Sequence, residues 1–339
     1  LLGSRVSATI LGLEGPILEA DEAMFFAEAQ PWGFILFARN VQSPEQLRRL
    51  TGDLRDALGR DAPILIDQEG GRVQRLRPPH WRDWMPALDQ MAVAGPERGP
   101  RSMYLRSRLI AAELRSVGID VNCTPLADVA RAETHPVLLN RLYGHDPETV
   151  TEAALAVALG LMEGGVVPVL KHLPGYGLGE VDSHETLPRV TADEGELRRI
   201  DFAAFEPLAH LPLGMTAHIV YEAFDPDRPA TLSPRMIRLI REEIGFGGLL
   251  MTDDLSMGAL PGPVGARAAR ARAAGCDLIL HCNGDRGEME DVLSEAGRMD
   301  DDALARGEAA LALRDRVEPL DMEAAEAELA DLLQGEVHG

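Results

Sequence analysis

The sequence lacks the features of several large classes of protein. No apolar run approaches the roughly 20 residues that a helix needs to span a bilayer. The first five residues lead straight into a strand-like segment and lack the layout of a signal peptide. The three cysteines are odd in number and form no Cys-x-x-Cys pair, so they provide neither a disulfide framework nor a metal knuckle. These absences favour a cytoplasmic location and argue against a membrane protein.

Basic residues are also scarce. The chain has 33 Lys and Arg against 55 Asp and Glu, a formal net charge of −22. Nucleic-acid binding requires a basic surface, so we expect no nucleic-acid partner, and an anionic membrane surface is equally disfavoured. Most acidic residues are interpreted as solvated surface. An anionic substrate would therefore need local cations that overcome the field of the whole protein.

Eight short apolar runs alternate with helix-like segments. Their continuous apolar character is typical of parallel strands that are covered on both faces. Eight alternations predict an α/β fold of the (β/α)8 TIM-barrel type. The alternative, an open doubly wound sheet, expects a glycine fingerprint after the first strand, and residues 12–15 do not supply one. The runs cover residues 8–13, 33–37, 63–67, 119–125, 166–172, 213–218, 248–253 and 277–282.

Cap residues predict where several helices begin. Ser43, Asp146 and Ser233 each precede a proline, which is the expected order of N-cap and first helical residue. Gln46 completes a capping box with Ser43, and Thr191 starts a second box. Without repeats or low-complexity linkers, 339 residues are interpreted as one domain. Helices from about residue 285 are expected to cover the outside of the barrel.

One stretch combines a strand, a glycine-rich loop and two pairs of polar residues. Lys171 and His172 end the strand, and Asp182 and His184 follow in the loop. Three glycines between the two pairs give the loop freedom to move. A simpler alternative is a surface turn in which Asp182 forms a cap and His184 is solvated, because Asp-x-His occurs often by chance.

Polar residues also follow other predicted strands at their carboxyl ends, where the active sites of barrels lie. Helix capping explains one such residue more simply than catalysis does. It does not easily explain five strand ends together. These ends carry Asp67, Asp128, Lys171 with His172, His218, and Asp253 with Asp254.

The motifs around these strand ends resemble glycoside hydrolase family 3, in its bacterial β-N-acetylglucosaminidase branch. The resemblance extends from about residue 33 to residue 283, and its segments occur in the family's order. They are GFILFARN at 33–40, IDQEGGRVQR at 66–75, NCTPLADV at 122–129, KHLPG at 171–175, DSH at 182–184, MTAH at 215–218 and TDDLSM at 252–257.

The resemblance implies a retaining double displacement. Asp253 would be the nucleophile that forms a glycosyl-enzyme, which water then hydrolyses. His184 would protonate the leaving oxygen and later deprotonate water, with Asp182 orienting its ring. An imidazole, with an ordinary pKa of about 6.5, suits both steps. Asp254 should point elsewhere, because successive side chains of a strand alternate, and is expected to cap or orient.

Five further residues are implied in substrate binding: Asp67, Arg75, Arg141, Lys171 and His172. Asp67 would accept hydrogen bonds from sugar hydroxyls, and the cations would donate to hydroxyls, the acetamido oxygen or an acidic aglycone. A structural salt bridge with a neighbouring aspartate is the alternative for Arg75. His218 either lines the pocket or forms hydrogen bonds behind the nucleophile. Tyr176 and residues 177–179 depart from the family's usual loop sequence.

The implied activity is the removal of N-acetylglucosamine from anhydro-muropeptides in cell-wall recycling, without a cofactor or metal, and we expect a monomer. A phosphorylase on the same scaffold remains open, since a neutral histidine does not repel phosphate. A zinc hydrolase using His172, His184, His218 and Asp253 would expect a His-x-His motif in the first strand, which is absent. A sugar-binding barrel without catalysis is disfavoured by the intact Asp253 and the intact loop pair.

Overall fold

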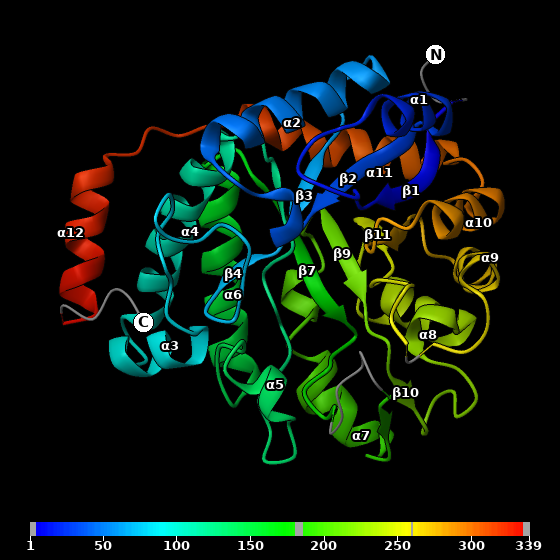
Figure 1. The fold of residues 1–339 in the computed structure, drawn as a ribbon. Coiled ribbons are helices and arrows are strands. Elements are labelled where there is room, and N and C mark those ends of the chain that lie inside the picture. The colour runs from blue at the N-terminus through cyan, green and yellow to red at the C-terminus, as the bar shows by residue number, and fades with distance from the viewer. Residues whose placement is uncertain (1–4, 180–185, 259, 335–339) are drawn as a thin grey trace.

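The computed structural model describes residues 5–179, 186–258 and 260–334. Within these ranges eight parallel strands form one sheet in the order β11-β9-β7-β6-β3-β2-β1-β12. A parallel bridge between Met251 and Leu278 joins the two outer strands, so the sheet closes into a (β/α)8 barrel (Figure 1). The strands are β1 (Ser7–Leu11), β2 (Pro31–Leu36), β3 (Ile64–Ile66), β6 (Val121–Asn122), β7 (Val167–Leu173), β9 (Leu213–Thr216), β11 (Leu249–Met251) and β12 (Ile279–His281).

Each predicted apolar run contains or overlaps one barrel strand, so the predicted fold is confirmed. Successive strand residues alternate between two cores. In β3, Leu65 packs in the cluster inside the barrel, whereas Ile64 and Ile66 pack in the cluster beneath the helices. Because both faces are buried, the strand sequences are continuously apolar, which is why they were recognisable.

Helices surround the barrel (Figure 1). The longer ones are α1 (Ala20–Ala29), α2 (Pro44–Leu58), α3 (Ala87–Ala94), α4 (Gly99–Ser116), α6 (Pro147–Glu163), α9 (Val264–Ala274), α10 (Arg286–Ala296), α11 (Asp301–Leu311) and α12 (Met322–Leu332). The shorter ones are α5 (Pro136–Leu139), α7 (Glu194–Leu197) and α8 (Pro234–Arg238). None of the helices described here is long and apolar enough to cross a membrane.

The helix starts agree with most predicted caps. Ser43, Asp146 and Ser233 each accept a hydrogen bond from a backbone N–H in the first turn of α2, α6 and α8. The box predicted at Thr191 is wrong. Asp193 caps α7 by accepting from the N–H of Glu196, because its carboxylate stands directly before the first helical residue.

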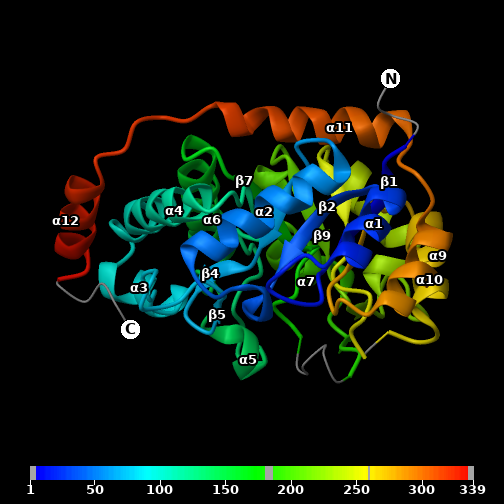
Figure 2. The ribbon, with the colours of Figure 1, turned by 45° about the horizontal axis from the view of Figure 1, so that its top comes forward.

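The C-terminal helices do more than cover the outside of the barrel. Ala303 and Ala310 of α11 belong to the core cluster inside the barrel, so this helix closes the amino-terminal end of the strands. Figure 2 shows α11 lying across the opposite end of the molecule from α5. α12 packs on α4 through Ala325 and Leu329. The carboxyl ends of the strands are left for the site.

Two small sheets stand at the carboxyl ends of the barrel strands. β4 (Gln68–Gly70) and β5 (Val73–Gln74) form an antiparallel pair directly after β3. β8 (Arg189–Val190) and β10 (Val220–Tyr221) pair in parallel. Charged residues of the site lie in the β4–β5 pair, in its turn or directly beside it: Asp67, Glu69, Arg72 and Arg75.

Candidate active site

A cavity of about 260 Å³ opens at the carboxyl ends of the barrel strands. This is just below the sizes typical of small-molecule sites, about 300–1,000 Å³, and suits a ligand as small as one sugar. Six of the residues predicted for the site line it: Asp67, Arg75, Arg141, Lys171, His172 and Asp253. Asp182 and His184, the predicted loop pair, lie outside the described residues. The fold therefore brings together six side chains that are up to 186 positions apart in the sequence (67 to 253).

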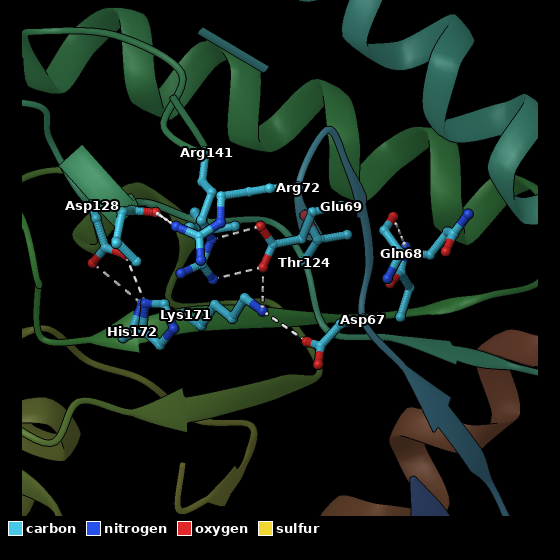
Figure 3. A network of polar contacts seen from close by, with 12 residues as sticks. Asp67, Gln68, Glu69, Arg72, Thr124, Asp128, Arg141, Lys171 and His172 are labelled. Carbon is cyan, nitrogen blue, oxygen red and sulfur yellow. Dashed lines mark hydrogen bonds and ion pairs between the residues drawn. The ribbon is translucent and has the colours of Figure 1, made fainter. Parts of the chain in front are cut away.

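Asp67 begins a chain of alternating charges (Figure 3). It follows β3 directly, and each of its two carboxylate oxygens accepts a hydrogen bond from one cationic side chain. Oδ2 accepts from Nη2 of Arg75 at 3.0 Å, and Oδ1 accepts from Nζ of Lys171 at 3.1 Å. The salt bridge considered as an alternative for Arg75 therefore forms, but both of its partners line the cavity.

Glu69 continues the chain from β4. Its carboxylate receives Arg141 through two parallel hydrogen bonds, from Nε at 2.9 Å and Nη2 at 2.8 Å. Nζ of Lys171 lies 2.7 Å from Oε1 of the same carboxylate. Lys171, the only lysine in the sequence, thus bridges Glu69 and Asp67 while remaining 2% exposed.

The pKa shifts follow from this alternation. Burial would raise the pKa of both carboxyls, but Lys171 and the arginines outweigh it and lower the pKa of Glu69 to about 2. The pKa of Asp67 is lowered further for the same reason. Burial acts to lower the pKa of Lys171, yet the two carboxylates raise it above its ordinary value. All three groups are therefore charged at neutral pH.

Asp128 fixes His172. The carboxylate, which can only accept, lies 2.8 Å from Nδ1 of His172, so Nδ1 carries the proton and Nε2 is the atom left for a ligand. Oδ1 of Asp128 also accepts the backbone N–H groups of His172 and Tyr176, at 3.3 and 2.7 Å. Because Asp128 is fully buried, the orientation of the imidazole is set by the protein interior.

Asp253 follows β11 and faces the cavity. Burial alone would raise the pKa of this carboxyl, but the neighbouring imidazoles of His218 and His172 and the N–H of Asp254 hold it below its ordinary value. Oδ1 accepts that N–H at 2.8 Å. Asp253 is therefore an ionised carboxylate on a rigid strand end, as a nucleophile must be.

The two neighbours of Asp253 have supporting contacts. Asp254 also lines the cavity, so the expectation that it points elsewhere is wrong. It accepts hydrogen bonds from the N–H of Ser256, the N–H of Cys282 and the Ser256 hydroxyl, which fits the expected orienting role. His218 is fully buried and is not among the cavity-lining residues. Its Nε2 lies 3.0 Å from the backbone oxygen of Asp254 and its Nδ1 2.7 Å from the Thr231 hydroxyl. Of the two alternatives for His218, the structure shows the one behind Asp253, the predicted nucleophile.

The glycines after β7 serve close packing. A Cβ atom at Gly177 would lie 2.0 Å from the backbone oxygen of Val129, and one at Gly179 would lie 2.4 Å from the Tyr176 ring. The oxygen of Gly177 accepts a hydrogen bond from the Thr134 hydroxyl at 2.5 Å. This segment is thus held against the barrel, which differs from the freedom expected from its composition.

Asp201 lies beneath this segment and is 1% exposed. Oδ2 accepts from Arg131 at 3.1 Å, whereas Oδ1 has no hydrogen-bond partner among the described residues. Burial outweighs the arginine and raises the pKa of Asp201 to about 6.

Glu69 and Asp128 were not predicted as site residues, although both stand in the motifs that carry the resemblance. Glu69 had a detectable signal. It follows Asp67 by two positions, and residues two apart in an extended chain share a face. Asp128 was noted as a polar residue at a strand end, but its contact with His172 could not be predicted, because this contact joins two different strand ends. Across the described ranges, no group of three or more His, Cys, Asp or Glu is arranged to hold a metal ion.

Comparisons with known proteins identify the family and the fold of the chain. The model of the glycosyl hydrolase family 3 N-terminal domain matches residues 17–305. A beta-hexosaminidase of Alkalilimnicola ehrlichii is 41% identical over 81% of this chain and 80% of its own. A beta-hexosaminidase of Methylococcus capsulatus is 40% identical over 80% of this chain and 81% of its own. The crystal structure of native NagZ from Neisseria gonorrhoeae superposes with a TM-score of 0.85 and 29% identity, covering 98% of this chain and 99% of that one.

Proposed function

The chain belongs to glycosyl hydrolase family 3, and from this premise we propose that it is a retaining exo-β-N-acetylglucosaminidase. The family and the barrel identify a glycoside hydrolase. One observation carries the finer proposal. Asp253, an ionised carboxylate, shares a cavity of small-molecule size with a preorganised set of hydrogen-bonding groups.

In the proposed mechanism, Asp253 attacks the anomeric carbon and forms a glycosyl-enzyme. His184 protonates the leaving oxygen and then deprotonates the water that hydrolyses the intermediate. Asp182 orients the imidazole ring of His184. These two roles rest on the resemblance alone. The mechanism explains why a second carboxylic acid is not required beside Asp253.

The chain of alternating charges has a defined part in this proposal. Asp67 accepts hydrogen bonds from sugar hydroxyls, while Lys171 and Arg141 donate. His172 presents Nε2, because Asp128 occupies Nδ1. Since each cation is already held by a carboxylate, little conformational freedom is lost when the sugar binds.

The proposed substrate is a muropeptide with a terminal N-acetylglucosamine on 1,6-anhydro-N-acetylmuramic acid, processed in the cytoplasm during cell-wall recycling. The similarity to NagZ and to bacterial beta-hexosaminidases supports this choice. The cationic groups in the cavity of an acidic protein also fit an acidic aglycone.

The test is release of nitrophenol from the 4-nitrophenyl β-glycosides of N-acetylglucosamine and glucose. Wild type should prefer the amino sugar, and Asp253→Ala should lose at least about 10³-fold in kcat, because the covalent route is removed. The exposed Asp227→Ala serves as a matched control and should retain activity. Mass spectrometry after a fluorosugar trap should place the glycosyl group on Asp253.

Two additions separate the alternatives. If phosphate stimulates turnover and the product is a sugar 1-phosphate, the enzyme is a phosphorylase and not a hydrolase. If a chelator abolishes activity and added zinc restores it, the enzyme is a metal-dependent hydrolase. If Asp253→Ala is as active as wild type, Asp253 is not the nucleophile.

A further inference from the structure

Arg72 stands at the turn between β4 and β5, and its side chain lines the cavity. The turn beneath it is rigid. Gly70 and Gly71 have φ angles of +105° and +56°, and a Cβ at Gly70 would lie 1.7 Å from the guanidinium of Arg106. Arg106, 1% exposed, donates to the backbone oxygens of Glu69 and Met85. The backbone that carries Arg72 is therefore fixed by the interior.

The Arg72 side chain is held as well. Its Nη1 donates to the backbone oxygen of Val137 in α5 at 2.7 Å. No further side-chain hydrogen bond of Arg72 is found in the described parts of the chain. The guanidinium is thus tethered by one nitrogen, while its remaining N–H groups stay available to a ligand.

The cations that line the cavity differ in whether a carboxylate pairs with them. Arg75 and Lys171 pair with Asp67, and Arg141 pairs with Glu69. Within the described ranges, Arg72 has no carboxylate partner. A tethered guanidinium that has no carboxylate partner among the described residues, beside a ligand cavity in a protein of net charge −22, is suited to bind an anion.

The degree of exposure indicates which part of a substrate Arg72 meets. Lys171 is 2% and His172 8% exposed, so they form the inner end of the cavity. Arg72 is exposed, and its neighbours Val73 and Val137 are half-buried, so they form the outer end. When an enzyme removes a terminal sugar, the sugar is enclosed and the leaving group extends toward solvent. The outer end is therefore where the leaving group lies.

We propose that Arg72 is a specificity-determining residue that binds an anionic group, a carboxylate, on the leaving group. This inference rests on the proposed function, since it requires a terminal sugar in the inner end of the cavity. It adds a recognition element for the leaving group that is separate from the charge chain of Asp67 and Glu69.

A pair of substrates, one with a free carboxylate and one in which a methyl ester removes the charge, tests the proposal. One is N-acetylglucosamine β-linked to a second sugar that carries a lactyl ether with a free carboxylate. The other is the methyl ester of the same disaccharide. The kcat/KM of each is measured for wild type, Arg72→Gln, Arg72→Lys and Arg48→Gln. Arg48 is an exposed arginine of α2, so its variant changes the net charge equally without touching the cavity.

Wild type should prefer the free acid over the ester. Arg72→Gln should lower kcat/KM for the acid by about 10- to 100-fold, the range of a hydrogen bond between charged groups, and for the ester by less than about twofold. Arg72→Lys should keep part of the preference. It retains the positive charge but loses the planar guanidinium, which can donate two parallel hydrogen bonds to a carboxylate. Arg48→Gln should behave as wild type, and added salt should weaken the preference of wild type.

Three results would overturn the inference. Wild type could hydrolyse both substrates equally well, Arg72→Gln could keep the full preference for the acid, or Arg72→Gln could lower both rates by the same factor. The last result would place Arg72 on the sugar instead of the leaving group. All three differ from failure of the proposed function, in which wild type releases N-acetylglucosamine from neither substrate.

Discussion

The two ends of the barrel use the same kinds of charged groups in different ways. At the amino-terminal end, Asp120 and Asp277 precede β6 and β12, and each is held by two arginines. At the carboxyl end, Asp67 and Glu69 are also held by two cations each. All four carboxylates are largely buried, so neither burial nor the number of ion pairs distinguishes the ends.

The backbone makes the difference. Asp120 accepts the N–H of Ile64, and Asp277 accepts the N–H of Leu250, both at 2.8 Å, so each joins a neighbouring strand. Among the described residues, Asp67 and Glu69 accept from side chains alone. Of these four carboxylates, the two bonded to backbone join strands of the barrel, whereas the two bonded only to side chains position groups that face the cavity. The role of a buried ion pair therefore depends on which other groups donate hydrogen bonds to its carboxylate.

Asp120→Asn should give the largest effect on stability. It leaves the half-buried Arg55 and Arg314 with one carboxylate fewer, and breaking a buried pair costs about 3–5 kcal/mol, here as an upper limit. The free energy of unfolding is measured by urea denaturation, and kcat/KM per folded molecule should stay within about twofold of wild type. Asp61→Asn is the matched control. Asp61 pairs with the same two arginines but is 69% exposed, so it should cost less than about 1 kcal/mol. Equal costs for both variants would contradict the comparison.

Asp201→Asn sharpens the comparison through pH, because Asp201 has one cation and an unpartnered oxygen. Its pKa is raised to about 6, so between about pH 4 and 6 the native protein binds a proton that the unfolded chain releases. The stability of wild type relative to Asp201→Asn should therefore fall as pH rises through this window, by at most about 3 kcal/mol. Denaturation of both proteins across this range provides the measurement. A difference that does not vary with pH would refute the raised pKa.

Glu69→Gln should lower activity through the two cations that face the cavity. Without the carboxylate, Lys171 and Arg141 lose the group that holds them in place, and kcat/KM should fall by about 100-fold. Steady-state kinetics should show the loss on both acid and neutral leaving groups, unlike that of Arg72→Gln. Glu222→Gln, which removes an exposed pair with Arg189, should change kcat/KM by less than about twofold. Unchanged kinetics in Glu69→Gln would show that the cations are positioned without it.

The sequence predicts those parts of the molecule in which local pattern and final environment agree. Strands such as β3 are apolar throughout because both faces are buried, and the cap at Ser43 lies next to the helix that it starts. Asp128 could not be assigned, since its partner His172 lies 44 positions away and only the closed barrel brings them together. At Gly177 composition suggested freedom, whereas a neighbouring strand end leaves no room for a side chain.

The position of Lys171 has a practical consequence. Because the sequence contains no second lysine, every side-chain amine in the protein belongs to the cavity. Two carboxylates keep that amine protonated and it is 2% exposed, so an acylating reagent meets it only when the surrounding pairs open. Modification of side-chain amines therefore reports on a single place, and its rate measures how often the interior of the site is exposed to solvent.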